Sequence, residues 1–312
     1  MSEAYQATNP KDKVFALQSL LHGYAGRLIN LDYEECCEAV FKRVTARCFN
    51  AITGLYLTQT FKFWFESPLS TEEPGGPSWV LDLAYTDAGF CGDKSTRDTR
   101  DKVTLDGFIS QNKVPRLQLE HGMDIVPFCT PTVLHCTGRC IDQVHRIASF
   151  PRLSDTTTQT AFTTLVWLSL QIFNARESLL GLPITREFGD IENTDFLSLT
   201  KFFMMQERWP EDQEELNRLA TIRGEELVGK PIFITKRGVV GIATAAIKPG
   251  DFLSLLHSSP TYLILRERKD RKDGERQHRI VARAAVNDKL LHEMKDMKAF
   301  IESTSSQHFQ II

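Results

Sequence analysis

The chain has 312 residues, 42% of them hydrophobic and 25% charged, and its 37 basic and 40 acidic side chains leave a formal net charge of −3. This balance excludes collagen-like repeats, wholesale disorder and a global electrostatic field for nucleic acid or anionic membranes. No stretch approaches the roughly 18 consecutive apolar residues of a membrane span, and the start lacks the apolar run of a secretory signal, so we expect a cytoplasmic protein with no membrane partner.

The N-terminal part is predicted to begin with two helices. Asn9-Pro10 is typical of a helix start, because asparagine caps the helix and proline fits its first position. A second helix is expected over residues 32–57, where acidic residues occupy the first turn. Strand-like runs follow at 103–109, 116–120 and 133–141, and Gly138 is expected to interrupt the last of these with a tight turn.

Three helices are expected in the middle of the chain. An apolar segment over residues 155–180 predicts a buried central helix that ends at a glycine–proline stop signal, with Trp167 as a core anchor. A second helix is expected to start at residue 194 or 195 and to end at 205. Pro210-Glu211-Asp212 starts an amphipathic helix that is expected to end near residue 223.

The C-terminal part changes to short strands separated by turn residues, at 232–235, 239–243, 252–256, 262–265 and 279–284. Their regular spacing is typical of a small antiparallel barrel or curled sheet. A helix over 288–300 and a polar, frayed tail over 303–312 are expected to follow. We therefore predict an α+β protein, in which a mostly helical part with a few strands (1–228) packs on a small antiparallel, barrel-like β-rich unit followed by a helix (229–312).

Six histidines and cysteines between residues 121 and 145 are the side chains best suited to metal binding or catalysis. Zinc requires four ligands arranged tetrahedrally, but their spacing matches no standard finger or ribbon, and adjacent residues of a strand point to opposite faces. The seven cysteines are expected to be mostly small, buried thiols. We predict no metal, cofactor or catalytic residue, and keep as the alternative a hydrolase or nucleotide-using enzyme with a site around His121, Cys129, His135 and His145.

Nucleic-acid binding is a third hypothesis, based on the charged run at 266–279, which has seven basic and four acidic residues. The interspersed acids and the missing aromatic residues favour a solvated hairpin around Asp273-Gly274 instead. No glycine-rich stretch has the spacing of a phosphate-binding loop. Nucleic acid is therefore not the expected partner.

Four segments in a fixed order carry a family resemblance. Residues 9–17 (NPKDKVFAL) are similar to the pattern D-P-R-D-K-V-[YF]-A-L-L-G-L, and residues 77–82 (PSWVLD) to L-P-S-W-V-P-D-W. Residues 136–144 (CTGRCIDQV) resemble v-x-G-x-x-[LVI]-D-x-I. Residues 231–266 resemble R-x-[FL]-x-T-x-x-G-x-x-G-L…GD…P-x-[VL]-L-R. Together they resemble the fungal heterokaryon incompatibility (HET) domain proteins, in the region C-terminal to the HET domain proper.

This resemblance implies a role in fungal allorecognition and the control of programmed cell death. The family's Y-x-[AT]-L-S-Y-x-W-G segment is missing before residue 9, so we expect a truncated or diverged member that acts as a non-catalytic regulatory region through contacts with an unknown protein partner. The matching positions are expected to be structural. They are Asp12, Lys13, Val14, Phe15, Ser78, Trp79, Asp82, Gly138, Asp142, Thr235, Gly238, Gly241, Gly250, Asp251, Leu265 and Arg266.

Overall fold

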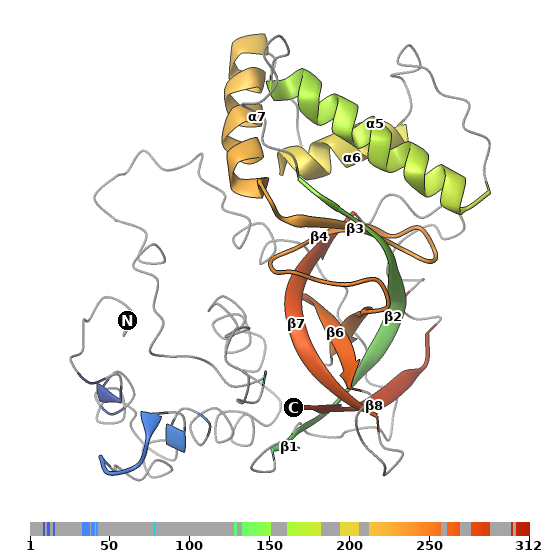
Figure 1. Ribbon diagram of the computed structural model, residues 1–312. Helices are drawn as coiled ribbons and strands as arrows, with labels where there is room; N and C mark the ends of the chain where they lie inside the picture. Colours follow the sequence, from blue (N-terminus) through green and yellow to red (C-terminus); the bar gives the residue numbers. More distant parts are fainter. Residues whose placement is uncertain are drawn as a thin grey trace.

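The computed structural model shows an α+β chain with a strand-rich C-terminal part, as expected (Figure 1). The helices are α5 (Ala161–Leu179), α6 (Thr194–Met204) and α7 (Gln213–Leu227). The strands are β1 (Phe128–Cys129), β2 (Leu134–Ser149), β3 (Pro231–Thr235), β4 (Val240–Ala243), β5 (Phe252–Leu256), β6 (Tyr262–Arg268), β7 (Gln277–Val286) and β8 (Ser306–Ile311). The structure describes residues 9, 11–12, 15, 33–37, 39–40, 42, 78, 128–129, 133–150, 161–181, 194–205, 212–256, 261–268, 276–287, 301 and 304–312.

The described strands form one mixed, eight-stranded sheet in the order β1-β2-β3-β4-β7-β6-β5, with β8 beside β2 and β7. The pairs along this order are antiparallel, whereas β8 runs parallel to β7 and antiparallel to β2. The 16-residue β2 pairs with β8 through residues 134–139, with β5 through 138–143 and with β3 through 144–149. Most of the sheet therefore depends on pairing with a strand that lies before residue 150.

Apolar residues alternate along the strands and so supply two separate cores, as a period of two requires. Ile232 and Ile234 of β3 face the helices, whereas Phe233 between them faces the opposite core. The same alternation separates Ile242 from Ala243 in β4. Both faces of the sheet are consequently buried at this end, which explains why β3 and β4 are almost continuously apolar.

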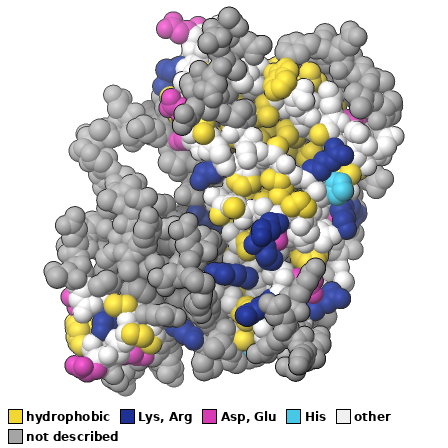
Figure 2. Space-filling view, in the orientation of Figure 1, with side chains coloured by type: hydrophobic (Ala, Val, Ile, Leu, Met, Phe, Trp, Pro, Cys, Tyr) yellow, Lys and Arg dark blue, Asp and Glu magenta, His cyan; other side chains and the backbone are white. Residues whose placement is uncertain are grey.

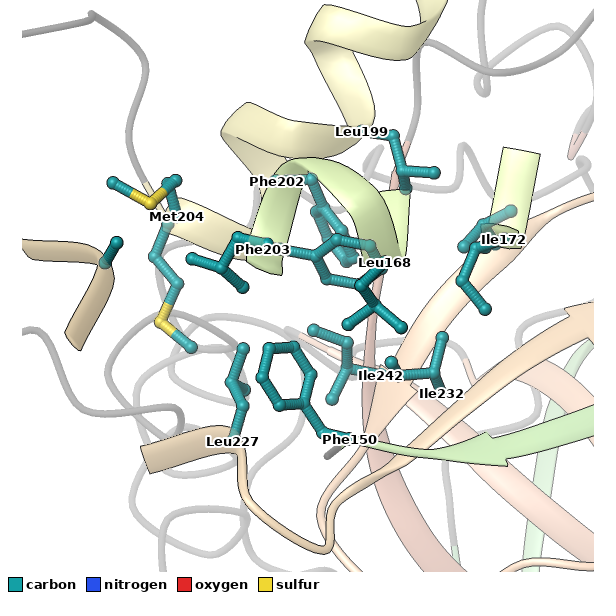
Figure 3. Packing of buried hydrophobic residues seen from close by; sticks show 14 of the residues in the cluster. Phe150, Leu168, Ile172, Leu199, Phe202, Phe203, Met204, Leu227, Ile232 and Ile242 are labelled. Carbon is teal, nitrogen blue, oxygen red and sulfur yellow. The ribbon is translucent and has the colours of Figure 1, made fainter. Parts of the chain in front are cut away.

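The three helices lie together at one end of the sheet, next to β3 and β4 (Figure 1). Their apolar side chains meet those of the strands in the first core, where the rings of Phe202 and Phe203 lie close to Leu168, Leu199 and the aromatic ring that ends β2 (Figure 3). That ring belongs to Phe150, whose centroid is 6.1 Å from the centroid of Phe203. The helices thus close one end of the sheet through aromatic and aliphatic packing.

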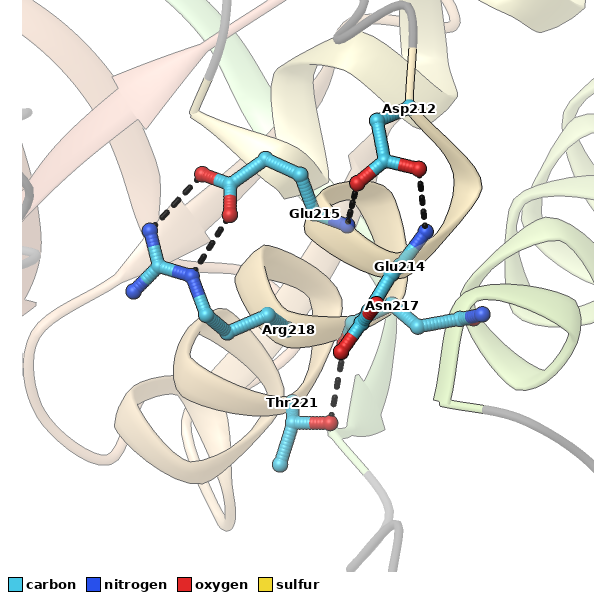
Figure 4. Close-up of polar contacts among 6 residues, drawn as sticks. All are labelled: Asp212, Glu214, Glu215, Asn217, Arg218 and Thr221. Atoms are coloured by element: carbon cyan, nitrogen blue, oxygen red, sulfur yellow. Dashed lines mark hydrogen bonds and ion pairs between the residues drawn. The ribbon is translucent and has the colours of Figure 1, made fainter.

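Helix α7 begins where the sequence places a cap. The Asp212 carboxylate accepts hydrogen bonds from the backbone N–H groups of Glu214 at 3.3 Å and Glu215 at 3.2 Å, which would otherwise have no partner in the helix (Figure 4). Glu215 and Arg218 form an ion pair one turn later, with 2.6 Å between Arg218 Nε and Glu215 Oε2. The helix continues to Leu227, one turn beyond the expected end, and the Val228 N–H bonds to the carbonyl of Gly224.

Three expectations are wrong. Gly138 does not form a tight turn, because β2 continues through it to Ser149. The tail after residue 303 is not frayed, because Ser306–Ile311 form β8. Trp167 is not a core anchor, because it lies on the outer side of α5 with 48% of its surface exposed. The expected helix at 288–300 and the strands at 103–109 and 116–120 lie outside the described residues, and the division at residue 228 stays a prediction.

Candidate functional site

The turn between β3 and β4 is built around two positions of the family pattern. Thr235 closes it, because its carbonyl accepts the Gly238 N–H at 3.0 Å and its Oγ1 accepts the Val239 N–H at 3.0 Å. Gly238 has a φ of +84°, a region that residues with a side chain rarely adopt. The sequence KRG therefore makes a tight turn that presents Lys236 and Arg237 to solvent.

Asp142 of β2 holds this turn against the sheet. Its Oδ2 accepts the backbone N–H of Arg237 at 2.8 Å, and its Oδ1 accepts the N–H of Gln143 at 2.8 Å. The Lys236 N–H also bonds to the Gln143 carbonyl at 2.9 Å. Both carboxylate oxygens of Asp142 are thus used to fix backbone, on a stretch where β2 carries register shifts on each side.

The second turn, at residues 248–251, meets β2 at the neighbouring residue. Asp251 is only 3% exposed, and its Oδ2 accepts the Lys248 N–H at 2.7 Å. Its two oxygens also accept hydrogen bonds from Arg266 Nε and Nη2, both at 2.8 Å, and this bidentate pair raises the pKa of Arg266. Val144 bonds to the turn through both its N–H and its carbonyl, at 2.8 Å each. Asp251 and Arg266 are therefore joined as one structural unit.

The sequence did not point to Arg176, which fastens helix α5 to the first turn. This arginine is fully buried, and its Nε donates to the Gly238 carbonyl at 2.8 Å while its Nη1 pairs with Glu177 Oε1 at 2.7 Å. In the sequence it is one polar residue that interrupts an apolar helix, a pattern more typical of a solvated position. The only sequence signal of its burial is that apolar residues surround it over several helical turns.

Ser78 links a distant part of the chain to the end of β8. Its backbone N–H donates to the Ile312 carbonyl at 3.0 Å and its hydroxyl donates to the same oxygen, while the Ile280 N–H donates to Ser78 Oγ at 3.0 Å. The residues just before β8 are held by Arg139, whose Nη1 donates to the carbonyls of Ile301 and Thr304, both at 2.8 Å. Ser78 therefore hydrogen-bonds to both β7 and the last residue of the chain.

The remaining family positions are also found in packing or turn contacts where the structure describes them. Tyr33 Oη donates to Asp12 Oδ1 at 2.9 Å, and its ring centroid is 4.8 Å from that of Phe15. Gly250 has a φ of +95°, and Leu265 is buried. Gly138 and Gly241 lie where strands approach so closely that a Cβ atom would meet backbone at 2.7 and 2.6 Å. Lys13, Val14, Trp79 and Asp82 lie outside the described residues.

Of the residues of the alternative enzyme site, Cys129 and His135 lie on the paired strands β1 and β2 at one end of the sheet, whereas His145 lies toward the other end of β2. His135 lies near one end of β2, in register with Phe128, and its ring stacks on His308 of β8 with centroids 5.3 Å apart. His145 is exposed near the other end, ten residues along the strand or roughly 30 Å away at the usual strand rise. Cys129 belongs to β1, and His121 lies outside the described residues.

Cysteine chemistry follows the environment of each thiol. Cys140 faces Ser254 across β2 and β5, and burial, aided by the nearby Asp142 carboxylate, raises its pKa to about 11. The Cys140 thiol is therefore protonated and weakly nucleophilic at neutral pH. Cys136 is buried. Within the described part of the chain, no three histidine, cysteine or acidic side chains gather to hold a metal ion.

The charge of the sheet differs from that of the whole chain. The described strands and turns contain three acidic residues, Asp142, Asp251 and Glu267, and the first two hold the turns at 236–238 and 248–251 by hydrogen bonds. The ranges counted are 133–150, 230–256, 261–268, 276–287 and 304–312. The same ranges contain eleven basic residues, namely Arg139, Arg146, Lys230, Lys236, Arg237, Lys248, Arg266, Arg268, Arg276, Arg279 and Arg283. Figure 2 shows basic side chains spread over the sheet surface with few acidic ones between them. The described part of the sheet is therefore basic, although the net charge of the whole chain is close to zero.

Comparison with protein-family profiles, curated proteins and solved structures found no match. Among the described helices, none combines the length and the apolar character that crossing a membrane requires. The function must therefore be inferred from the contacts of the chain itself.

Proposed function

We propose that the chain is a non-catalytic recognition region of the kind that the HET resemblance implies, and that it acts in fungal allorecognition and cell-death control through contact with a protein partner in the cytoplasm. The observation that carries this proposal is that the charged side chains at the family positions form hydrogen bonds within the fold. Asp142, Asp251 and Arg266 direct their charged groups at backbone or at one another. Residues used in this way shape a surface and leave its exposed side chains to make contacts.

The exposed side chains on these turns support the same proposal. Lys236, Arg237 and Lys248 lie in solvent at the tips of turns whose backbones are fixed by hydrogen bonds. Rigid turns lower the entropy lost on association, so charges placed there favour selective binding. We also infer that the sheet wraps round into a barrel-like unit, which the pairing of β2 with both β3 and β5 supports.

A genetic complementation experiment tests the proposed function. In a fungus that encodes this chain, deletion of the gene should abolish the growth arrest that follows fusion with an incompatible strain. Reintroduction of the natural chain should restore growth arrest. Variants His135→Ala and His145→Ala should restore it equally well, because a recognition region does not depend on these histidines.

Two results would overturn the proposal. One is a deletion strain whose incompatibility reactions are all unchanged. The other is loss of complementation in a folded His135→Ala or His145→Ala variant, which would favour the enzyme alternative. Folding of each variant is checked by its circular dichroism spectrum and melting temperature.

A further inference from the structure

The second half of β2 has an open edge. Residues 144–149 pair with β3 on one side, and among the described strands none pairs with them on the other side. The turn at 248–251 covers that other side only as far as Val144, whose N–H and carbonyl bond to Asp251 and Gly250. Arg146, Ala148 and Ser149 beyond it are exposed. An exposed strand edge presents backbone donors and acceptors to any extended chain that reaches it.

Basic side chains lie on both sides of β2 near this edge, and we name residues 145–149 with Lys236, Arg237 and Lys248 the basic edge. Arg146 lies on the strand, Lys248 lies on the turn where coverage of the edge ends, and the other two cations lie on the turn that bonds to Asp142 and Gln143. The nearest acids of the described chain, Asp142 and Asp251, are both engaged in holding these turns. The local charge is therefore positive.

We infer that the basic edge binds an extended, acidic segment of a protein partner, which adds to β2 as a further strand. This inference rests on the proposed function, since it names the partner chemistry of the same recognition region. Main-chain hydrogen bonds of strand addition supply affinity, and alternate side chains supply selectivity. Carboxylates on every second residue of the incoming segment then meet the cations beside the edge, which favours acidic partners over neutral ones.

The size of the basic edge favours a peptide over nucleic acid. Five residues of strand span about 16 Å, which matches an incoming segment of similar length with two or three carboxylates on one face. Proteins that bind duplex DNA through its backbone typically contact roughly six to ten phosphates. A patch of four exposed cations confined to two turns and one strand is too compact for such a contact set.

A fluorescence-anisotropy titration with synthetic peptides tests the inference. The probe is a labelled peptide of alternating glutamate and valine, and the comparison peptides replace glutamate with lysine or carry N-methyl groups on alternate backbone amides, one peptide for each set of alternate amides. We expect the acidic peptide to bind, the lysine peptide not to bind, and one of the two N-methylated peptides to bind about tenfold more weakly. Affinity should also fall between about 50 and 200 mM salt.

Two double variants locate the site. Arg146→Glu with Lys248→Glu should weaken binding of the acidic peptide by about tenfold or more, since it reverses the charge on the open strand and on the turn beside it. The matched control, Arg268→Glu with Arg276→Glu, makes the same change of charge on the β6–β7 hairpin and should change affinity less than about twofold. Melting temperatures of both double variants show whether each is folded.

Each other outcome overturns the inference in a distinct way. Equal binding of both N-methylated peptides would exclude strand addition, and equal effects of the two double variants would exclude the basic edge as the site. Tighter binding of a single-stranded oligonucleotide than of the acidic peptide would identify a nucleic-acid surface. A concentration-dependent dimer that disappears with Arg146→Glu and Lys248→Glu, without peptide binding, would identify a second copy as the occupant. Failure of any kind here, with successful complementation by the natural chain, leaves the proposed function standing.

Discussion

Replacement of Gly241 by alanine should destabilise the sheet strongly, although it adds only one methyl group. Gly241 lies in β4 directly opposite Phe233 of β3, on the strand pair that separates the two cores. A Cβ atom at this position would be 2.4 Å from Phe233 Cζ and 2.6 Å from the carbonyl oxygen of Ala285. Both distances lie well inside van der Waals contact, so either the ring or the strand has to move.

The size of the effect follows from what can move. Phe233 is fully buried, so its ring cannot swing into solvent, and the Ala285 carbonyl belongs to the backbone of β7. Overpacking a closed core costs about 1–3 kcal/mol, and two simultaneous clashes place Gly241→Ala near the upper end of that range. Gly229→Ala is the matched control, because its φ of +72° is unfavourable for alanine but no atom lies within 4 Å of the added methyl group. Its expected cost is about 1 kcal/mol.

Urea unfolding followed by circular dichroism measures both variants, with the slope against denaturant checked for constancy. Phe233→Leu separates the causes, because leucine lacks the Cζ and Cε1 atoms that the new methyl group would touch. The double variant Gly241→Ala with Phe233→Leu should be more stable than the sum of the single changes by about 1 kcal/mol or more. Additivity of the two changes, or a cost of Gly241→Ala no larger than that of Gly229→Ala, would refute the packing argument.

Three further predictions concern buried polar groups. Arg176→Met should cost about 3–5 kcal/mol of unfolding free energy, because the Gly238 carbonyl and the Glu177 carboxylate lose their buried partner. Urea unfolding measures this cost, and the control Arg218→Met should lose clearly less stability because its ion pair is exposed. Asp251→Asn should cost about 1–2 kcal/mol, and a double-variant cycle with Arg266→Gln should show that the two losses are coupled. Burial lowers the pKa of His278 although Glu267 acts in the opposite direction, so below the ordinary histidine value of about 6.5 the unfolded chain binds a proton that the folded chain does not. Stability should therefore fall as the pH falls from that value, and melting curves of His278→Phe, which cannot take up this proton, should show a weaker dependence on pH.

The strands after residue 230 could be predicted closely because their signals are local. Thr235 and Gly238 mark one turn, Pro249 and Gly250 mark the next, and short apolar runs between such turns are typical of strands. The structure places β3, β4 and β5 within one residue of the expected bounds. Helices α5 and α6 were also predicted, because a glycine stop and a threonine start delimit their apolar segments.

Non-local pairing explains the errors in β2 and β8. Gly138 has the sequence signature of a turn, but in the fold its missing side chain allows the Leu255 carbonyl to approach within 2.7 Å of where a Cβ would be. In β8 only Phe309 and Ile311 are buried, so its alternation is too short to predict a strand. The strand forms because β2, about 170 residues earlier in the chain, offers a pairing edge.

The candidate site shows the same division between local and non-local information. The pattern around Asp142 could be identified in the sequence, but its task could not, since the N–H that it accepts belongs to Arg237 in a turn 95 residues later. Arg176 gave no functional signal, because only the fold brings its guanidinium to the Gly238 carbonyl. Sequence patterns therefore located the turns, and three-dimensional contacts were needed to say what each residue holds.

Strand β2 connects most of the described sheet. It pairs with β1, β3, β5 and β8, and both basic turns bond to its residues 142–144. Pairing with β5 reaches residue 143 and pairing with β3 begins at residue 144, so the stretch that follows is open beside Arg146 on the side away from β3. Strand β2 thus fixes the turns that carry Lys236 and Lys248 and also supplies the open edge beside Lys248, so the contacts of one strand account for the position of the basic edge.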